Sequence, residues 1–290
     1  MPFFKNLFGK SNNHKKQDPL ADIEVVSGFI IPQAFVDHWH EIKKTEKEFI
    51  SINATPSDNL TLQQSKFGHY PCIPKGFPYP LDRLGNYMFP LAQINCSELP
   101  PQSVLPESGY LQFYIGGGDS YTYGLELDNG TESDFKVLFF TERQVEKPED
   151  DMSFLDEVLK NSNSPVFEPH ELRFQLKHEY VGYGDYESRF MSEFDLESII
   201  SKYPTLKETL EEKAQNIFTP FGHKLGGYAY FTQTDPREYD NSIRDFKLLF
   251  QMDSDDRIMW GDLGVGNFFI HPDDLAKRDF STVFYTWDCS

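Results

Sequence analysis

The stretch LLFQMDSDDRIMWGDLGVGNFFI, residues 248–270, is the most informative about the fold of this 290-residue chain. Two apolar runs enclose an acidic segment with Asp253, Asp255, Asp256 and Asp262, and three glycines lie close behind. Short runs rich in aromatic and aliphatic residues are typical of strands, whereas Asp and Gly favour turns. The stretch therefore predicts a strand, an acidic connection and a second strand.

Short segments of the first half of the chain recur in the second half in the same order. The matched pairs are Phe67-Gly68-His69 with Phe221-Gly222-His223, residues 91–95 with 249–253, residues 109–115 with 264–270, and Phe139-Phe140-Thr141 with Phe284-Tyr285-Thr286. Recurrence at similar spacing indicates an internal duplication of one β-rich unit. The two related halves are expected at about residues 60–142 and 215–290.

Periodicity predicts short strands in the middle of the chain and helices before and after them. Strands are expected at 110–115, 135–141 and 172–180, where aromatic and aliphatic residues concentrate. Apolar positions at helical spacing predict helices over 33–49 and within 193–217, with a short helix from Pro272.

The domain expectation follows from composition along the chain. Residues 1–20 are polar and basic and are expected to form a disordered tail; a weak contact of this segment with a membrane stays open. Residues 21–290 are expected to form a single domain, in which a mixed strand and helix segment joins the two halves. Three separated cysteines and the lack of a long apolar run predict reduced thiols, no transmembrane segment and a cytoplasmic location.

The acidic connection was weighed as a ligand site. A calcium loop that starts at Asp253 would need Gly at its sixth position, where Ile258 stands. A non-standard divalent or small-ligand site formed by Asp253, Asp255 and Asp262, with Trp260 beside them, remains an alternative. Turn formation explains the aspartates without a ligand, so neither a metal nor a cofactor is expected.

The first half carries the counterparts of this candidate site, His69 and Gln93. Cys72 lies close to His69 and is the nearest approach to a nucleophile with a base, but a half-buried structural thiol is the favoured interpretation. Glycines at 116–118 are not followed by the Lys-Ser or Lys-Thr of a phosphate loop, and no nucleophile elbow or zinc-protease motif occurs. No reaction is therefore indicated, and a protein without enzymatic activity is the favoured interpretation.

The formal net charge of −19 argues against a nucleic-acid ligand, whose binding depends on clustered cations. Residues 119–157 hold twelve acidic side chains against three basic ones. Such a surface favours a basic protein partner, because complementary charge speeds the encounter.

Several motifs together resemble the YwqG-like family of bacterial proteins, a domain of unknown function. They are PCIPKGFPYP (71–80), MFPLAQINCSELP (88–100), LPESGYLQFY (105–114), HKLGGYAYFTQTDPR (223–237), the opening stretch, and FSTVFYTWDCS (280–290). The chain departs from the family pattern at His69, where Gly is usual, and at Tyr79, where Trp is usual. The resemblance implies an α+β fold with duplicated sheets in a soluble intracellular protein, and it supplies no catalytic residues. Together with the expected strands and helices, it predicts an α+β fold, internally duplicated, with mainly antiparallel β-sheets and flanking helices.

Members of that family tend to lie beside genes for secreted polymorphic toxins, which implies an immunity or accessory role. The leading hypothesis is a non-enzymatic protein-binding module that uses an acidic surface. The first alternative is a small-ligand or metal-dependent enzyme with an acidic site between the halves. The second is a carbohydrate-binding module, which would expose Trp260 or tyrosines to the sugar.

Overall fold

The computed structural model describes residues 17–101, 105–116, 122–125, 134–160, 163–190 and 194–290. These ranges leave out most of the predicted tail, the glycines 117–118, and residues 119–121 and 126–133 of the acidic stretch 119–157. Within them, no helix has the length and apolar character needed to cross a bilayer.

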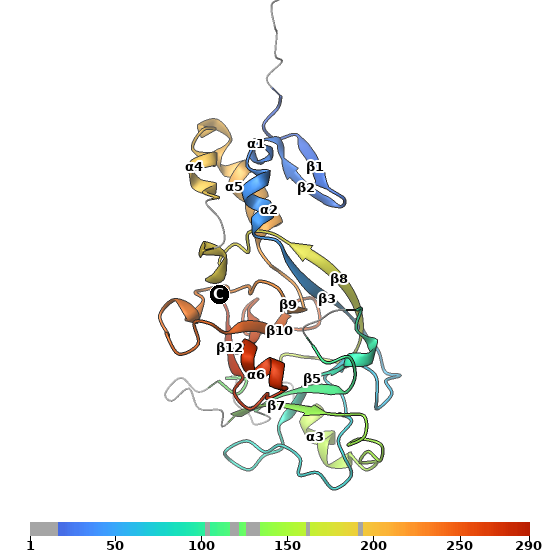
Figure 1. The fold of residues 1–290 in the computed structure, drawn as a ribbon. Helices are drawn as coiled ribbons and strands as arrows, with labels where there is room; N and C mark the ends of the chain where they lie inside the picture. The colour runs from blue at the N-terminus through green and yellow to red at the C-terminus, as the bar shows by residue number, and fades with distance from the viewer. Residues whose placement is uncertain (1–16, 102–104, 117–121, 126–133, 161–162, 191–193) are drawn as a thin grey trace, which may run out of the picture. The chain divides into compact units, whose positions relative to one another are not determined.

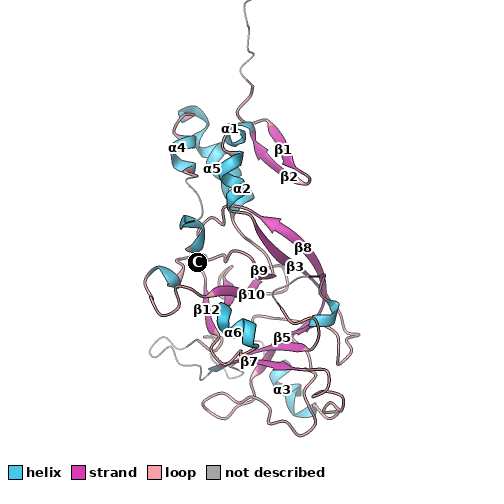
Figure 2. Cartoon of the chain, in the orientation of Figure 1, coloured by secondary structure: helices cyan, strands magenta, loops and turns pink. Residues whose placement is uncertain are grey.

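The chain forms two compact units. The smaller unit contains residues up to Lys43 and residues from Glu193 to Ile217, and the larger contains the rest. The smaller unit has the hairpin of β1 (Asp22–Val26) and β2 (Phe29–Pro32) and most of the helical residues (Figures 1 and 2). Its helices are α1 (Gln33–Val36), α2 (Trp39–Lys44), α4 (Leu196–Ile200) and α5 (Lys207–Phe218), of which α2 and α5 extend just past its borders.

The larger unit is built on one ten-stranded sheet in the order β12-β11-β10-β9-β3-β8-β4-β5-β6-β7. All neighbouring strands are antiparallel. The strands are β3 (Lys47–Pro56), β4 (Lys66–Phe67), β5 (Phe89–Asn95), β6 (Tyr110–Ile115), β7 (Phe135–Phe140), β8 (His170–Glu179), β9 (Lys224–Gly226), β10 (Lys247–Asp253), β11 (Val265–Ile270) and β12 (Phe284–Asp288). The strand, connection and strand predicted for residues 248–270 is confirmed by β10 and β11.

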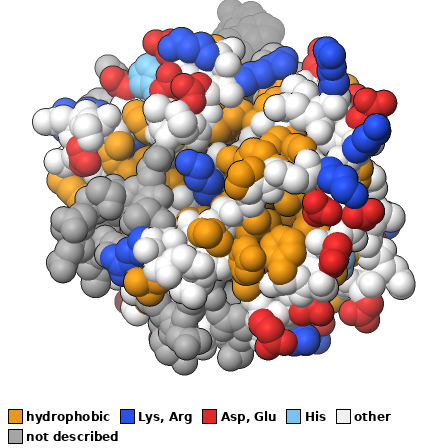
Figure 3. Space-filling view, turned by 90° about the horizontal axis from the view of Figure 1, so that it is seen from below, with side chains coloured by type: hydrophobic (Ala, Val, Ile, Leu, Met, Phe, Trp, Pro, Cys, Tyr) orange, Lys and Arg blue, Asp and Glu red, His pale blue; other side chains and the backbone are white. Residues whose placement is uncertain are grey.

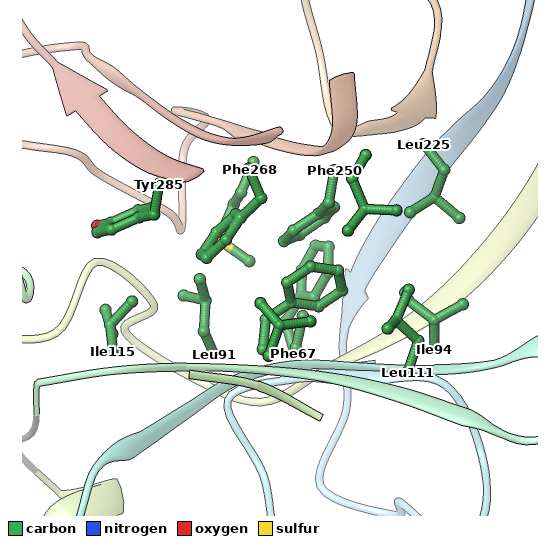
Figure 4. Packing of buried hydrophobic residues seen from close by; sticks show 14 of the residues in the cluster. Phe67, Leu91, Ile94, Leu111, Ile115, Leu225, Phe250, Phe268 and Tyr285 are labelled. Carbon is green, nitrogen blue, oxygen red and sulfur yellow. The ribbon is translucent and has the colours of Figure 1, made fainter. Parts of the chain in front are cut away.

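The sheet curls until its two ends face each other, in the manner of a nearly closed barrel. Phe113 of β6 lies 5.0 Å from Phe268 of β11, measured between ring centroids, and Phe135 at the start of β7 lies 5.3 Å from Tyr285 of β12. Figure 4 shows Phe250, Phe268 and Tyr285 pointing from one side toward the side chains of the other. Aromatic side chains from both ends of the sheet thus fill one shared interior.

The expectation of an α+β fold with flanking helices is wrong, because the protein is mainly β. In the larger unit the α-helical segments α3 (Asp156–Leu159) and α6 (Pro272–Lys277) are each little more than one turn (Figure 2). A sheet that curls on itself buries its inner face against its own far end and needs no helical layer to cover that face. The helix predicted over 33–49 also ends early, because the chain enters β3 at Lys47.

The two ends of the sheet are built alike. β4 to β7 follow one another in space as β9 to β12 do. The pairing of β5 with β6 slips at Leu91, and the pairing of β10 with β11 slips at Leu249. A bulge increases local twist and bends a strand, so both ends bend at the same position. Whether the two halves arose by duplication stays a prediction.

Candidate functional site

A buried glutamine organises the first end of the sheet. The side-chain oxygen of Gln93 accepts hydrogen bonds from the backbone N–H of Cys72 at 2.6 Å and from the amide of Gln112 at 2.8 Å. Its nitrogen donates to the carbonyl oxygens of Leu62 and Gln64, each at 2.9 Å. All four hydrogen-bonding positions of this amide are therefore used, and the segment before β4 is tied to β5.

Gln251 does the same at the second end. Its nitrogen donates to the carbonyl oxygens of Pro220 at 2.9 Å and Gly222 at 2.8 Å, and its oxygen accepts from the N–H of Tyr230 at 2.8 Å. The sequence comparison pairs Gln93 with Gln251. In the structure both side chains hold a neighbouring segment of the chain in place through hydrogen bonds to its backbone.

The structure shifts the alignment of the neighbouring residues by four positions. Lys66 pairs with Gln93, and Lys224 pairs with Gln251, so these two lysines are equivalent. His223 then corresponds to Ser65 and not to His69. Both Ser65 and His223 accept the backbone N–H of the last residue of the adjacent strand, at 2.8 Å and 3.0 Å respectively. The sequence alignment matched the two Phe-Gly-His motifs to each other. The strand pairing instead matches the residues that lie opposite the two glutamines.

His223 anchors the acidic connection. Its Nδ1 accepts the N–H of Asp253, so its Nε2 carries a proton and donates to Asp255 at 3.1 Å. Burial opposes ionisation of Asp255, but the bonds from His223 and from the amides of Arg257 and Ile258 outweigh it and lower the pKa to about 2. Both ring nitrogens of His223 are occupied, so the pair serves as a structural clamp.

The other predicted residues of this loop also have structural contacts. The Asp253 carboxylate accepts the N–H groups of Gly222 and Ser254, and burial raises its pKa despite these bonds. The backbone carbonyl of Asp262 accepts the N–H of Ser290 at 3.2 Å. Trp260 is fully buried and packs edge-on against Tyr123, so its ring offers no face to a sugar.

The structure does not gather the three predicted aspartates around one point. Across the described ranges, no three His, Cys, Asp or Glu side chains are arranged to hold a metal ion. Asp253 and Asp255 come together only through His223.

An acidic pocket of about 560 Å³ lies beside the first end of the sheet. One wall is the segment with Leu60 and Leu62, which Gln93 and Lys66 hold in place. A second wall is His69 and Tyr70, and the third is the segment 149–156, which leads into α3. Figure 3 shows the face that lies toward α3 at the bottom of Figure 1, where acidic side chains gather along the border of a broad hydrophobic area.

Four carboxylates line the acidic pocket. Glu149 accepts the N–H of Gly76 at 3.2 Å, and Asp151 accepts both the N–H and the hydroxyl of Ser153. Asp156 accepts the Tyr70 hydroxyl at 2.5 Å, which raises the pKa of that phenol. Asp150 has a cationic contact, with Lys75 at 3.4 Å, and this hydrogen bond lowers the pKa of the carboxyl. These contacts do not neutralise the four carboxylates, so the pocket keeps a strong negative charge.

His69 packs against Tyr70 in the wall of the pocket, with the two ring centroids 5.0 Å apart. Its Nδ1 is buried, with no hydrogen bond to another described group. Burial, followed by the charge of Lys66, lowers the pKa of the imidazole against the opposing effect of a hydrogen bond with the Tyr70 backbone. The ring is therefore neutral near pH 7.

Sequence reasoning found His69 and Gln93 but missed Lys66, Tyr70 and Asp156. The run Glu149-Asp150-Asp151 was a usable signal, because it is the densest acidic part of 119–157 that the structure describes. The contact of Tyr70 with Asp156 joins residues far apart in the chain and has no local signature.

A family model described as "Domain of unknown function (DUF1963)" matches residues 65–289. The chain belongs to this family. The match covers the acidic pocket from His69 onward and every strand of the large sheet except β3. A search of curated proteins found no match to the chain.

Proposed function

We propose that this protein is a non-enzymatic protein-binding module and that the acidic pocket receives a cationic side chain of a basic protein partner. The observation that carries the proposal is the hollow lined by four carboxylates, of which Asp150 is paired with a lysine through a long contact. An ammonium or guanidinium group that enters would meet several negative charges at once, and charge-assisted hydrogen bonds are about twice as strong as neutral ones.

One further observation supports a basic partner. The net charge of −19 would draw a basic protein toward the chain from a distance and would make its association sensitive to salt. This effect acts in the same direction as the pocket.

We infer a cytoplasmic immunity or accessory role for this binding activity. The support is the resemblance to the YwqG-like family, whose members tend to lie beside toxin genes. The matched family model names no reaction, which leaves the binding geometry as the stronger guide.

The test is the binding of a fluorescein-labelled decalysine peptide at several salt concentrations. We expect affinity to fall as salt rises, and the double variant Asp151→Asn, Asp156→Asn to bind about tenfold more weakly, which is about 1.4 kcal/mol. Asn at position 156 can still accept the Tyr70 hydroxyl, so the fold should be kept.

A matched control is available elsewhere on the surface. The Asp279 carboxylate accepts the N–H and the hydroxyl of Ser281, just as the Asp151 carboxylate accepts those of Ser153. Asp279 and Asp151 are both exposed. Asp240 accepts the N–H and the hydroxyl of Ser242 in the same way. The double variant Asp240→Asn, Asp279→Asn removes the same net charge away from the pocket. If it weakens peptide binding as much as the pocket variant does, the pocket is not the site.

A further inference from the structure

The large sheet has a gap the width of one strand between β3 and β10. β9 lies between them but ends at Gly226, which pairs with Phe49 of β3. On its other side β9 pairs with β10 only at Gln251, although β10 begins at Lys247. Past Gly226, the start of β3 and the start of β10 therefore have no strand between them. Neighbouring strands lie about 4.8 Å apart, so removing one leaves a slot of about twice that width.

A cavity of about 270 Å³ opens in this gap. Most of its apolar lining comes from the interior of the barrel and includes Ile50, Leu105, Leu176, Leu225, Leu249 and Leu275. The volume is close to the lower limit of small-molecule sites, about 300 Å³, and is larger than the dry cavities of about 150 Å³ that bind benzene. It suits one branched side chain or a short alkyl chain.

The rim of the cavity carries two cations that share one anion. Lys47 lies 2.7 Å and Lys247 lies 2.8 Å from the carboxylate of Glu187. Each ammonium group has three N–H donors and gives one to Glu187, so both can still donate to the carboxylate of a ligand. Glu48 also lines the cavity, with its carboxylate 3.9 Å from His178 on the neighbouring strand.

We propose that this cavity binds a monocarboxylate with a short apolar tail. The tail would lie among the leucines, and the carboxylate would meet Lys47 and Lys247 at the rim. Two sources share this chemistry: a free medium-chain acid, and the C-terminal residue of a polypeptide that lies along the slot which β9 leaves open. Extended peptides bind in this way to exposed strand edges, with backbone bonds for affinity and a pocket for the side chain. The site is separate from the acidic pocket and does not depend on the function proposed for it.

Calorimetric titration of the whole chain with octanoate, octanol and octylamine tests the charge preference. We expect octanoate to bind about tenfold more tightly than octanol, and octylamine to bind no better than octanol. Equal affinity for octanoate and octanol, or no binding of octanoate, would overturn the proposal.

Two variants place the ligand in the cavity. Lys247→Gln alters a half-exposed side chain and should reduce octanoate affinity several-fold without changing octanol binding. Leu275→Trp fills the cavity from α6 and should abolish binding of both. Lys277→Gln, on the same helix but outside the cavity, is the control and should bind octanoate normally. If Lys247→Gln and Leu275→Trp both bind octanoate as the original chain does, the cavity is not the site.

A final comparison separates the two sources. A hexapeptide that ends in leucine is titrated with a free C-terminus and with an amidated one. Tighter binding of the free form than of octanoate indicates a polypeptide end, whereas weaker binding indicates a free acid. If the protein binds the free and the amidated peptide with equal affinity, and also binds octanoate no better than octanol, then it does not recognise a carboxylate and the proposal is refuted.

Discussion

Lys66 and Lys224 occupy equivalent positions at the two ends of one sheet, and their surroundings differ. Each is at most 1% exposed, and each pairs across the ladder with a glutamine. Lys224 forms a salt bridge with Glu179 at 2.8 Å and lies over the ring of Phe49. Lys66 instead donates to two carbonyl oxygens, of Thr61 and Leu62, each at 2.7 Å.

The difference shows two ways to bury an amine. Burial lowers the pKa of both lysines, but Glu179 counteracts that effect on Lys224 and favours its charged form. Lys66 has weaker help from Cys72 and Glu98, and burial lowers its pKa to about 7. One end of the sheet therefore contains an ion pair, and the other contains an amine that can lose its charge near neutral pH.

The largest expected effect comes from breaking the ion pair. Glu179→Gln should lower the free energy of unfolding by about 3–5 kcal/mol, because it leaves the charge of Lys224 buried without compensation. The glutamine can still accept the N–H of Tyr228, so the loss reports the charge. Urea denaturation at pH 7 measures it.

The control for this prediction is the double variant Glu179→Gln, Lys224→Met. Removing both charges should recover most of the lost stability, since a pair replaced by apolar groups is often close to neutral. If Glu179→Gln alone lowers the free energy of unfolding by less than about 1 kcal/mol, the ion pair adds little to stability. The two lysines would then not differ in how their burial is compensated.

A smaller effect is expected for the pH dependence caused by Lys66. Its pKa in the folded chain is lower than in the unfolded chain, so the unfolded state binds more protons between about pH 7 and 10.5. Stability should therefore rise with pH in that window. Relative to Lys66→Met, the original chain should gain about 2 kcal/mol between pH 7 and pH 9, at about 1.4 kcal/mol per pH unit. Parallel stability curves for the two proteins would contradict the assignment.

The smallest effect concerns Asp255, which the clamp with His223 keeps ionised. Its folded pKa of about 2 is below its usual value, so its contribution is present above pH 4 and is lost as pH falls toward 2. Because the side chain is 39% exposed, we expect only about 1 kcal/mol. Between pH 5 and pH 2 the original chain should lose that much more stability than Asp255→Asn, measured by urea denaturation. A larger loss in the variant would mean that the clamp is not electrostatic.

Local sequence patterns predicted several strands well and the fold class poorly. The run 110–115 and the stretch 248–270 form strands where alternating and aromatic residues indicated them. The helical spacing over 33–49 gave a helix that continues too far, because Lys47–Phe49 join the sheet and tertiary pairing overrides local preference. Whether a sheet needs a helical cover depends on its curvature, which no local pattern contains.

The candidate site shows the same division. The residues themselves indicate that Asp255 lies in the connection between two strands and that residues 149–151 are acidic, because turn preference and charge are local properties. Asp253, also expected in a turn, is instead the last residue of β10. The folded chain alone decides that His223 corresponds to Ser65, that Trp260 is buried, and that Tyr70 reaches Asp156. Those contacts join residues distant in the chain, and they form only when the chain folds into the curled sheet.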